Sequence, residues 1–570
     1  MGIRGLIRYL QRQLGRKIEP TPIAEKAFNV AKLYIDFPQM VHKALKDLTP
    51  DNVSGVDDIS VIQKTLENVI QLIKSLAPTE FLGIYFDGIP PLAKVVEQRT
   101  RRYEMAAASE SKFNKAKITV GTSFMSQVVK RVIDVIDRNL DWLPPEIVIS
   151  TITEPGEGEH KLFTRIRSKD LNSHGAKVIV SDDTDSTVMA LLNGLKDTHV
   201  YIDHPSQHGR PPIRGLLNID DIADAIQYRL QKSPTALTDF VLMVLLTGGN
   251  DFTPWLQAGR DRSSILSLMI DLYVQNDVPL TQNAGKEFIW DNIRKLMAKV
   301  ALNEERLLKH LIETTRGKLP HAPKLYLNSI DMRTGLFNFE LFKQAWDKEI
   351  YSLHAVSPVV IPKPSYKEIE ADHDHMATEF LTGVRWSYNY MLTGTGPDWY
   401  YKPSVLPPLL VDIARVLSKG VDPSRSLLTM PEWKPLELSV YLLTILPEKS
   451  AKDLVDSRLH QAFLLESGLM DLFPLTFEIF GPGEIKEGAA KGILPPLGLD
   501  RLTKWVREHI PLGVIESNLM DIDGVHKYSK KMRRWYRGST EDGHKAKSPE
   551  VATQPTVAHG YEVCELIIRE

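Results

Sequence analysis

The sequence has little cysteine, no long apolar run and almost no net charge. Cys564 is the one cysteine among 570 residues, which excludes an internal disulfide and a cysteine-rich zinc site. No uninterrupted apolar run is long enough to cross a bilayer, so no membrane association is expected, and no secretory signal peptide is predicted. The formal net charge is −2, so any basic surface for a nucleic acid must be local.

Apolar runs alternate with helical patterns in the first half of the chain. This alternation predicts an α/β fold with a mostly parallel sheet flanked by helices. Five short runs have the composition of buried strands, and a sixth apolar run is placed with them. The five runs are 33–36, 81–86, 146–150, 177–181 and 200–203, and the sixth is 240–246.

Strand signals become rare after residue 284, and three regions are predicted. Residues 1–284 form the α/β domain, and residues 285–510 form a mainly helical domain. Residues 511–570 form a C-terminal tail that is partly disordered, since residues 538–559 are polar and show no periodicity. Within the first region, residues 104–117 are expected to form a flexible surface connection.

Carboxylates gather at the predicted C-terminal ends of the strands, the edge where open parallel sheets bind ligands. Asp183 and Asp185 are two residues apart, so in an extended segment they point to the same side. Glu157 and Glu159 repeat this spacing beside glycines, which permit unusual backbone angles. The full set is Asp36, Asp87, Glu157, Glu159, Asp183, Asp185 and Asp251.

Seven carboxylates at one edge would repel one another unless cations neutralise them. Hard oxygen ligands favour Mg²⁺ or Mn²⁺, and two such ions ~4 Å apart would suit phosphodiester hydrolysis. The alternative for each single aspartate is a helix N-cap, which is common. The presence of all seven carboxylates at one edge favours the metal site over seven separate N-caps.

A basic helix follows the strand that ends at Asp87. Lys94, Gln98, Arg101 and Arg102 lie at positions i, i+4, i+7 and i+8, so at ~3.6 residues per turn they share one face. Three cations and an amide beside a strand-end carboxylate predict a phosphate pocket next to the metal site. The alternative is a solvated basic helix.

These motifs resemble those of the Xrn family of 5′→3′ exoribonucleases. The resemblance extends from residue 1 to about residue 505. Its most specific segments are 155–161 (PGEGEHK) and 249–252 (GNDF). The other matching segments are 33–36, 86–102, 121–125, 183–185, 386–401, 446–450, 473–478 and 494–497.

The resemblance implies a PIN/FEN-like nuclease core and a processive enzyme that degrades single-stranded RNA with a 5′-monophosphate to mononucleotides, as in mRNA decay. It implies that the seven carboxylates hold two Mg²⁺ ions, with Mn²⁺ as a substitute, and that the basic helix face binds the 5′-phosphate. His42 corresponds to the histidine that stacks on the 5′ base, and Trp399 is the candidate for the opposite wall. If the two residues do not stack on a base, His42 would be an ordinary histidine on a helix surface and Trp399 would pack in the core.

Two other functions stay open from the sequence. The opening residues 1–6 also resemble flap-endonuclease-like DNA nucleases, although no helix-hairpin-helix pattern follows Asp251. The second alternative function is that of a non-catalytic RNA-binding or structural protein on the same fold. Loss of catalysis should have removed at least one of the seven carboxylates, and none is lost. A short form without the long C-terminal extension of the large cytoplasmic enzymes is expected, in the cytoplasm or alternatively the nucleus.

Overall fold

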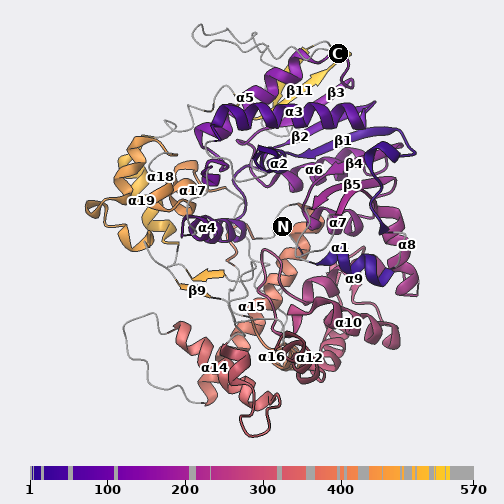
Figure 1. Ribbon diagram of the computed structural model, residues 1–570, viewed down its shortest axis with the longest axis vertical. Helices are drawn as coiled ribbons and strands as arrows, with labels where there is room; N and C mark the ends of the chain where they lie inside the picture. Colours follow the sequence, from indigo (N-terminus) through magenta and orange to yellow (C-terminus); the bar gives the residue numbers. More distant parts are fainter. Residues whose placement is uncertain are drawn as a thin grey trace.

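An eight-stranded sheet organises the computed structural model (Figure 1). Its strand order is β12-β11-β3-β2-β1-β4-β5-β6. The structure describes residues 3–538 apart from 4, 15–17, 49–55, 108–112, 205–212, 232, 317–323, 355–365, 395–397, 403–406, 421–434, 452–453, 475–477, 481–490, 494–496, 512–518, 520–521 and 533.

The central strands of the sheet are parallel, as the sequence predicts. Because they are parallel, their C-terminal ends meet at one edge of the sheet. β6 (Ile213–Asn218) closes one side of the sheet in antiparallel pairing with β5. In sheet order the parallel strands are β3 (Glu146–Ser150), β2 (Phe81–Tyr85), β1 (Val30–Asp36), β4 (Ala176–Val180) and β5 (Thr198–His204).

The other side of the sheet comes from the C-terminal region. β11 (Val525–Ser529) pairs antiparallel with β3, and β12 (Arg534–Gly538) pairs antiparallel with β11. The sequence predicts no strand in residues 511–570, because lysines and arginines interrupt the apolar alternation of this hairpin. This part of the predicted tail is a component of the sheet, and residues 539–570, with Cys564, lie outside the described residues.

Two local predictions were wrong. The run 240–246 is helical and belongs to α9 (Ala236–Leu246), which is buried on all sides, and periodicity cannot separate a buried helix from a buried strand. The stretch 104–117 is regular at both ends, since α4 (Leu92–Ala107) continues into it and Lys115–Lys117 form a 3₁₀ turn, while residues 108–112 lie outside the described residues.

Helices cover both faces of the sheet, and in Figure 1 α3 and α5 lie above the strands while α7 to α9 lie below them. Along β1, Leu33 and Ile35 enter one core and Tyr34 the other, as the period of two requires. The first core contains α2 (Pro38–Leu48), α3 (Asp58–Leu76) and α5 (Ser123–Arg138). The second contains α1 (Leu6–Leu14), α6 (Gly158–Arg165), α7 (Thr184–Leu192), α8 (Ile219–Arg229), α9 and α10 (Arg262–Asn276).

The region after residue 284 is mainly helical, as predicted. It begins within a short hairpin in which β7 (Thr281–Gln282) pairs with β8 (Glu287–Phe288). α15 (Tyr366–Thr393) packs against α7 and α9, and therefore returns to the α/β part. The helices around it are α11 (Trp290–Ala301), α12 (Glu304–Arg316), α13 (Lys324–Asn328), α14 (Phe339–His354) and α16 (Leu410–Ser418).

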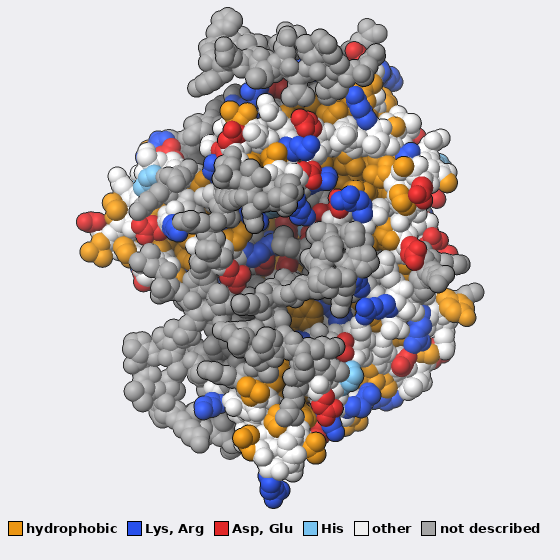
Figure 2. Space-filling view, viewed as in Figure 1, with side chains coloured by type: hydrophobic (Ala, Val, Ile, Leu, Met, Phe, Trp, Pro, Cys, Tyr) orange, Lys and Arg blue, Asp and Glu red, His pale blue; other side chains and the backbone are white. Residues whose placement is uncertain are grey.

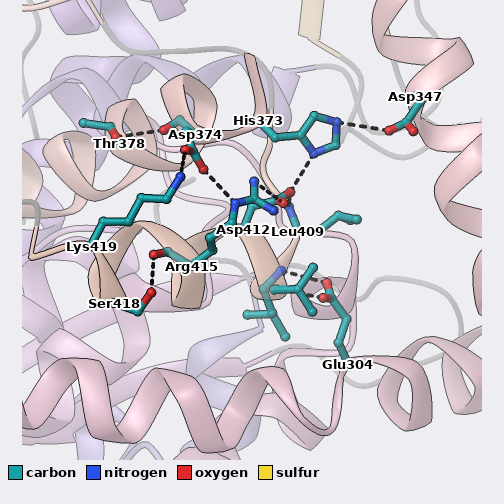
Figure 3. A network of polar contacts seen from close by, with 12 residues as sticks. Glu304, Asp347, His373, Asp374, Thr378, Leu409, Asp412, Arg415, Ser418 and Lys419 are labelled. Carbon is teal, nitrogen blue, oxygen red and sulfur yellow. Dashed lines mark hydrogen bonds and ion pairs between the residues drawn. The ribbon is translucent and has the colours of Figure 1, made fainter. Parts of the chain in front are cut away.

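Buried polar side chains join these helices (Figure 3). His373 on α15 lies 3.0 Å from Asp347 Oδ1 on α14 and 2.9 Å from Asp412 Oδ2 on α16. Glu304, the first residue of α12, accepts the N–H groups of Leu410 and Val411 at 2.8 and 3.0 Å. These two N–H groups begin α16 and have no partner within the helix, so Glu304 fixes its start.

A last group of helices packs on the first core. α17 (Leu438–Ile445) lies against α4 and α19 (Leu499–His509), close to α18 (Glu448–Ala451). A short hairpin joins β9 (Glu478–Phe480) to β10 (Lys491–Ile493). The mainly helical region after residue 284 thus contacts the α/β part through both α15 and α17. Among the described helices, none is both long and apolar enough to cross a bilayer.

Candidate active site

Four loops at the C-terminal edge of the sheet bring the predicted carboxylates together. Asp36 is the last residue of β1, and Asp87 follows β2 by two residues. Glu157 follows β3 and is the N-cap of α6, while Asp183 follows β4 and caps α7 by accepting the N–H of Asp185 at 3.1 Å. Asp251 follows helix α9 instead of a strand. Asp183 is therefore a helix N-cap, as the alternative interpretation expected, and it also belongs to the carboxylate cluster.

Gly158 fixes the distance between two of these loops. Its N–H donates to Asp87 Oδ1 at 2.8 Å. A Cβ at this position would lie 2.8 Å from Asp36 Oδ1 and 2.7 Å from the carbonyl oxygen of Tyr85, so a larger residue would push the loops apart. Gly156 has φ +102°, which confirms the expected unusual backbone angle. The glycines of the PGEGEHK segment thus allow the glutamates to approach the aspartates.

Two overlapping groups of side chains have the spacing of a metal site. Glu159, Asp183 and Asp185 form one group, and Glu157, Glu159 and His160 form the other; in each, the possible ligand atoms lie within 4.8 Å of one another. Glu159 belongs to both groups. The donor atoms are mainly carboxylate oxygens, which suit hard divalent cations. This arrangement of buried acids can hold a divalent metal ion.

The electrostatics of the cluster are those of a site that needs a cation. Burial, followed by the charges of neighbouring carboxylates, raises the pKa of Asp36, Glu159 and Asp185 well above the usual range. Burial also raises the pKa of Glu157, to about 7, against the opposing effect of Lys94. A divalent ion would offset this repulsion and favour the ionised carboxylates.

Lys94 joins the basic helix to the acidic cluster. Its Nζ lies 2.7 Å from Glu157 Oε2 and 2.6 Å from Asp251 Oδ2. Burial alone would lower the pKa of Lys94, but Asp251 and Glu157 outweigh it and the pKa is raised. Burial would likewise raise the pKa of Asp251, but Lys94 and Arg101 hold it below its usual range. A charged lysine therefore stands between two carboxylates at the start of α4.

The rest of the predicted basic face continues along α4. Gln98 Oε1 accepts the hydroxyl of Tyr441 at 2.8 Å. Arg101 Nε pairs with Glu97 Oε1 at 2.5 Å. Arg102 donates to the carbonyl oxygens of Lys115 and Ile118 at 3.3 and 2.6 Å, so part of its guanidinium stabilises the following loop.

The two predicted base-stacking residues have different surroundings. His42 on α2 is half-buried, and burial, then Arg102, Lys115 and Arg101, lowers its pKa to about 4. Those charges place His42 beside the basic face. Trp399 is 5% exposed, and its carbonyl oxygen accepts the N–H of Leu92 at 2.8 Å at the start of α4. The burial fits a packing role, and base stacking by Trp399 stays a prediction.

Several residues that shape the site were not predicted from the sequence. Tyr390 on α15 donates its hydroxyl to Glu157 Oε1 at 3.0 Å, and its ring stacks on His160 at 3.6 Å between centroids. The backbone N–H of Ile3 donates to Asp185 Oδ1 at 3.0 Å. The aromatic segment that contains Tyr390 was a visible signal, but no local pattern shows which carboxylate its hydroxyl reaches.

The space-filling view agrees with this geometry. Figure 2 shows basic and acidic side chains next to one another in a hollow near the centre of this face. In Figure 1 the same central area lies between α4 and α7. The charged groups of the site therefore lie below the surrounding surface instead of projecting from it.

Comparisons with known proteins give matches to 5′-3′ exonucleases. Residues 1–202 match the family model described as the XRN 5′-3′ exonuclease N-terminus. The 5′-3′ exoribonuclease 1 of Saccharomyces cerevisiae is 26% identical over 305 residues, which are 45% of this chain and 19% of that protein. A Caenorhabditis elegans 5′-3′ exoribonuclease 2 homologue is 21% identical over 371 residues, which are 51% of this chain and 37% of that protein.

The chain spans only part of these relatives: the first three matches cover 17–21% of their lengths. Among solved structures, the catalytic core of Rad2 in complex with DNA substrate matches 75% of this chain and 98% of that chain. Its identity is 12% and its TM-score is 0.31, which is too low to support any conclusion about function.

Proposed function

We propose that the chain is a processive 5′→3′ exoribonuclease of the Xrn type, whose N-terminal family model matches residues 1–202. Its substrate is single-stranded RNA with a 5′-monophosphate, which it hydrolyses to mononucleotides. One observation supports this most: Lys94, on the helix that carries the basic face, contacts two carboxylates of the metal-binding cluster. Gln98 lies one turn further on, ~6 Å along the helix axis. A phosphate at the basic face would thus leave the next phosphodiester bond close to the carboxylates.

The acidic cluster fits two Mg²⁺ ions, with Mn²⁺ as a substitute. The fit rests on the two overlapping ligand groups and on the raised pKa values of buried carboxylates. When bound, such ions supply an activated water and stabilise the attacking and leaving oxygens. The protein residues have separate roles: the carboxylates are the ligands, Tyr390 orients Glu157, and Lys94 balances Glu157 and Asp251.

His42 is proposed to stack on the 5′ base. Its lowered pKa keeps the imidazole neutral near neutral pH, and a flat neutral ring accepts any base. Trp399 is proposed as the opposite wall. Stacking on flat rings depends little on base identity, which suits an enzyme that digests any sequence.

The test compares kcat/KM for matched RNAs that carry a 5′-phosphate or a 5′-hydroxyl. The wild type should prefer the phosphate end, because a terminal phosphate offers the cations of the basic face more negative charge and more free oxygens than a hydroxyl does. Arg101→Gln should remove most of this preference, while Arg294→Gln, which changes a half-exposed arginine on α11, should keep it. A wild type with no preference between the two ends would overturn the phosphate pocket.

Two further arms of the same assay separate the alternatives. A matched DNA strand should be digested far more slowly than RNA; equal or faster digestion would favour the flap-endonuclease-like reading of the fold. Asp185→Asn should abolish metal-dependent turnover while the protein still binds RNA. Binding without turnover in the wild type would instead indicate a non-catalytic RNA-binding protein.

A further inference from the structure

A groove lies at the edge of the sheet opposite the carboxylate cluster. It has a volume of about 500 Å³ and is formed where α3 leads into β2, α5 leads into β3 and β11 turns toward β12. β3 has five residues, so ~17 Å of strand separates the groove from the catalytic edge. In Figure 1 this part of the molecule is at the top, where α3, α5 and β11 meet. The groove is therefore distinct from the active site.

An exposed indole forms one side of the groove. Trp142 is 41% exposed, although tryptophan side chains are highly buried on average. Its Nε1 donates to Asn139 Oδ1 at 2.9 Å, and Lys74 Nζ lies 5.6 Å from the ring centroid. The ring is thus held in place while a large part of it stays open to solvent. A fixed flat aromatic surface is what a nucleotide base stacks on.

The charged groups around the indole are mainly cations. Lys74 and Lys530 line the groove together with one acid, Asp141. The backbone N–H of Lys530 donates to the carbonyl oxygen of Pro145 at 2.9 Å, which fixes the turn between β11 and β12 against the groove. Lys531 and Arg534 continue the basic surface and are exposed. A chain with a net charge of −2 thus has a local excess of positive charge at this turn.

We propose that this groove is a second binding site for single-stranded RNA, in which a base stacks on Trp142 and phosphates pair with Lys74 and Lys530. The identity of the ligand rests on the proposed function. Because the groove and the catalytic edge are at opposite edges of the sheet, the groove holds a part of the RNA that is not being cut. It raises the affinity for long RNA and contributes nothing to a substrate of a few nucleotides.

A circular RNA isolates this site, because it has no 5′ end to enter the basic pocket. We expect the wild-type protein to bind a circular RNA of about thirty uridines, measured by fluorescence anisotropy without divalent metal. Trp142→Ala and Lys530→Glu should each weaken this binding by roughly fivefold or more. Both positions are exposed, so the thermal unfolding midpoint should stay unchanged.

Matched controls distinguish the groove from general charge and aromatic effects. Lys309→Glu makes the same charge change at an exposed position of α12, which lies in the lower part of Figure 1, far from the groove at the top. Tyr228→Ala removes an aromatic side chain that is 80% exposed. Both should leave the affinity for circular RNA unchanged. Digestion of a 5′-phosphorylated RNA of a few nucleotides should be the same in wild type, Trp142→Ala and Lys530→Glu.

Three results would overturn the proposal: a wild type that does not bind circular RNA, groove variants that bind it as the wild type does, or equal losses in the controls. Any of these results would mean that the groove does not bind RNA and has another use, such as docking of a protein segment. Failure of the 5′-phosphate assay would instead overturn the proposed exoribonuclease function, and the binding of circular RNA would still report on the groove.

Discussion

Tyr441 donates its hydroxyl to Gln98 Oε1 at 2.8 Å, and this bond ties the helical region to the basic face of α4. Tyr441 is buried on α17, whereas Gln98 belongs to the helix that begins beside the acidic cluster. Burial raises the pKa of Tyr441, so its hydroxyl stays protonated and can donate. The amide of Gln98 therefore has its oxygen turned to the tyrosine, which leaves its N–H₂ group as a donor for a phosphate oxygen.

Tyr441→Phe should weaken the recognition of a 5′-phosphate without disturbing the hydrolytic step. The substitution keeps the ring and removes the bond that orients Gln98, a loss of about 0.5–1.5 kcal/mol. We expect KM for 5′-phosphorylated RNA to rise by roughly twofold to tenfold, with kcat nearly unchanged. KM for 5′-hydroxyl RNA should not change. An equal rise for both ends would mean that Tyr441 acts only in packing.

The sequence predicted the sheet and the carboxylates at its C-terminal edge better than the contacts between them. Strand-end carboxylates are visible because parallel strands end at one edge, and Asp36 and Asp87 needed no further information. The contact of Lys94 with Asp251 was not predictable, since it joins residues 157 positions apart through a helix mistaken for a strand. The β11–β12 hairpin was hidden for a similar reason: its pairing with β3 is set by tertiary structure, not by its own pattern.

Glu159→Gln should stabilise the metal-free protein and make it much less sensitive to divalent cations. In the metal-free state Glu159 is destabilised by burial and by Asp183, Glu157 and Asp185, so a neutral amide should raise the free energy of unfolding by about 1–3 kcal/mol. Mg²⁺ at 100 times its Kd should stabilise the wild type by about 2.7 kcal/mol and the variant by much less. Thermal unfolding with and without Mg²⁺ measures both effects.

The matched control for this prediction is Glu313→Gln, which removes an exposed carboxylate on α12. It should leave the response to Mg²⁺ at the wild-type size. A Glu159→Gln protein that is less stable than the wild type without metal, or that keeps the full response, would contradict the assignment of Glu159 as a ligand shared by two groups.

Lys94→Met should have the opposite effect on the metal-free protein. Removal of the ammonium leaves the buried carboxylates of Glu157 and Asp251 without their cation, which costs about 3–5 kcal/mol. A divalent ion bound nearby should offset part of this cost. The rise in the unfolding midpoint on addition of Mg²⁺ should therefore be larger in Lys94→Met than in the wild type. A smaller rise would show that Lys94 is needed to assemble the site.

His373→Gln should make the stability of the helical region less dependent on pH. Burial alone would lower the pKa of His373, but hydrogen bonds to Asp347 and Asp412 outweigh it and raise the pKa to about 9. A raised pKa means that the imidazolium stabilises the fold fully below its ordinary pKa of 6.5, and that this contribution is lost as the pH rises through about 9. Glu304, whose pKa burial raises to about 8, weakens the fold over the same range but is present in both proteins.

The difference in unfolding free energy between wild type and His373→Gln therefore isolates the histidine. We expect about 1–3 kcal/mol at about pH 6, the contribution of hydrogen bonds to a charged group, and a much smaller difference near pH 9.5. His375→Gln, which changes an exposed histidine two residues along the same helix, should show no such difference at either pH. Urea unfolding monitored by the fluorescence of the buried Trp346 and its neighbours provides the measurement. Equal differences at the two pH values would mean that His373 is neutral in the folded protein and bonds to only one of its two carboxylates.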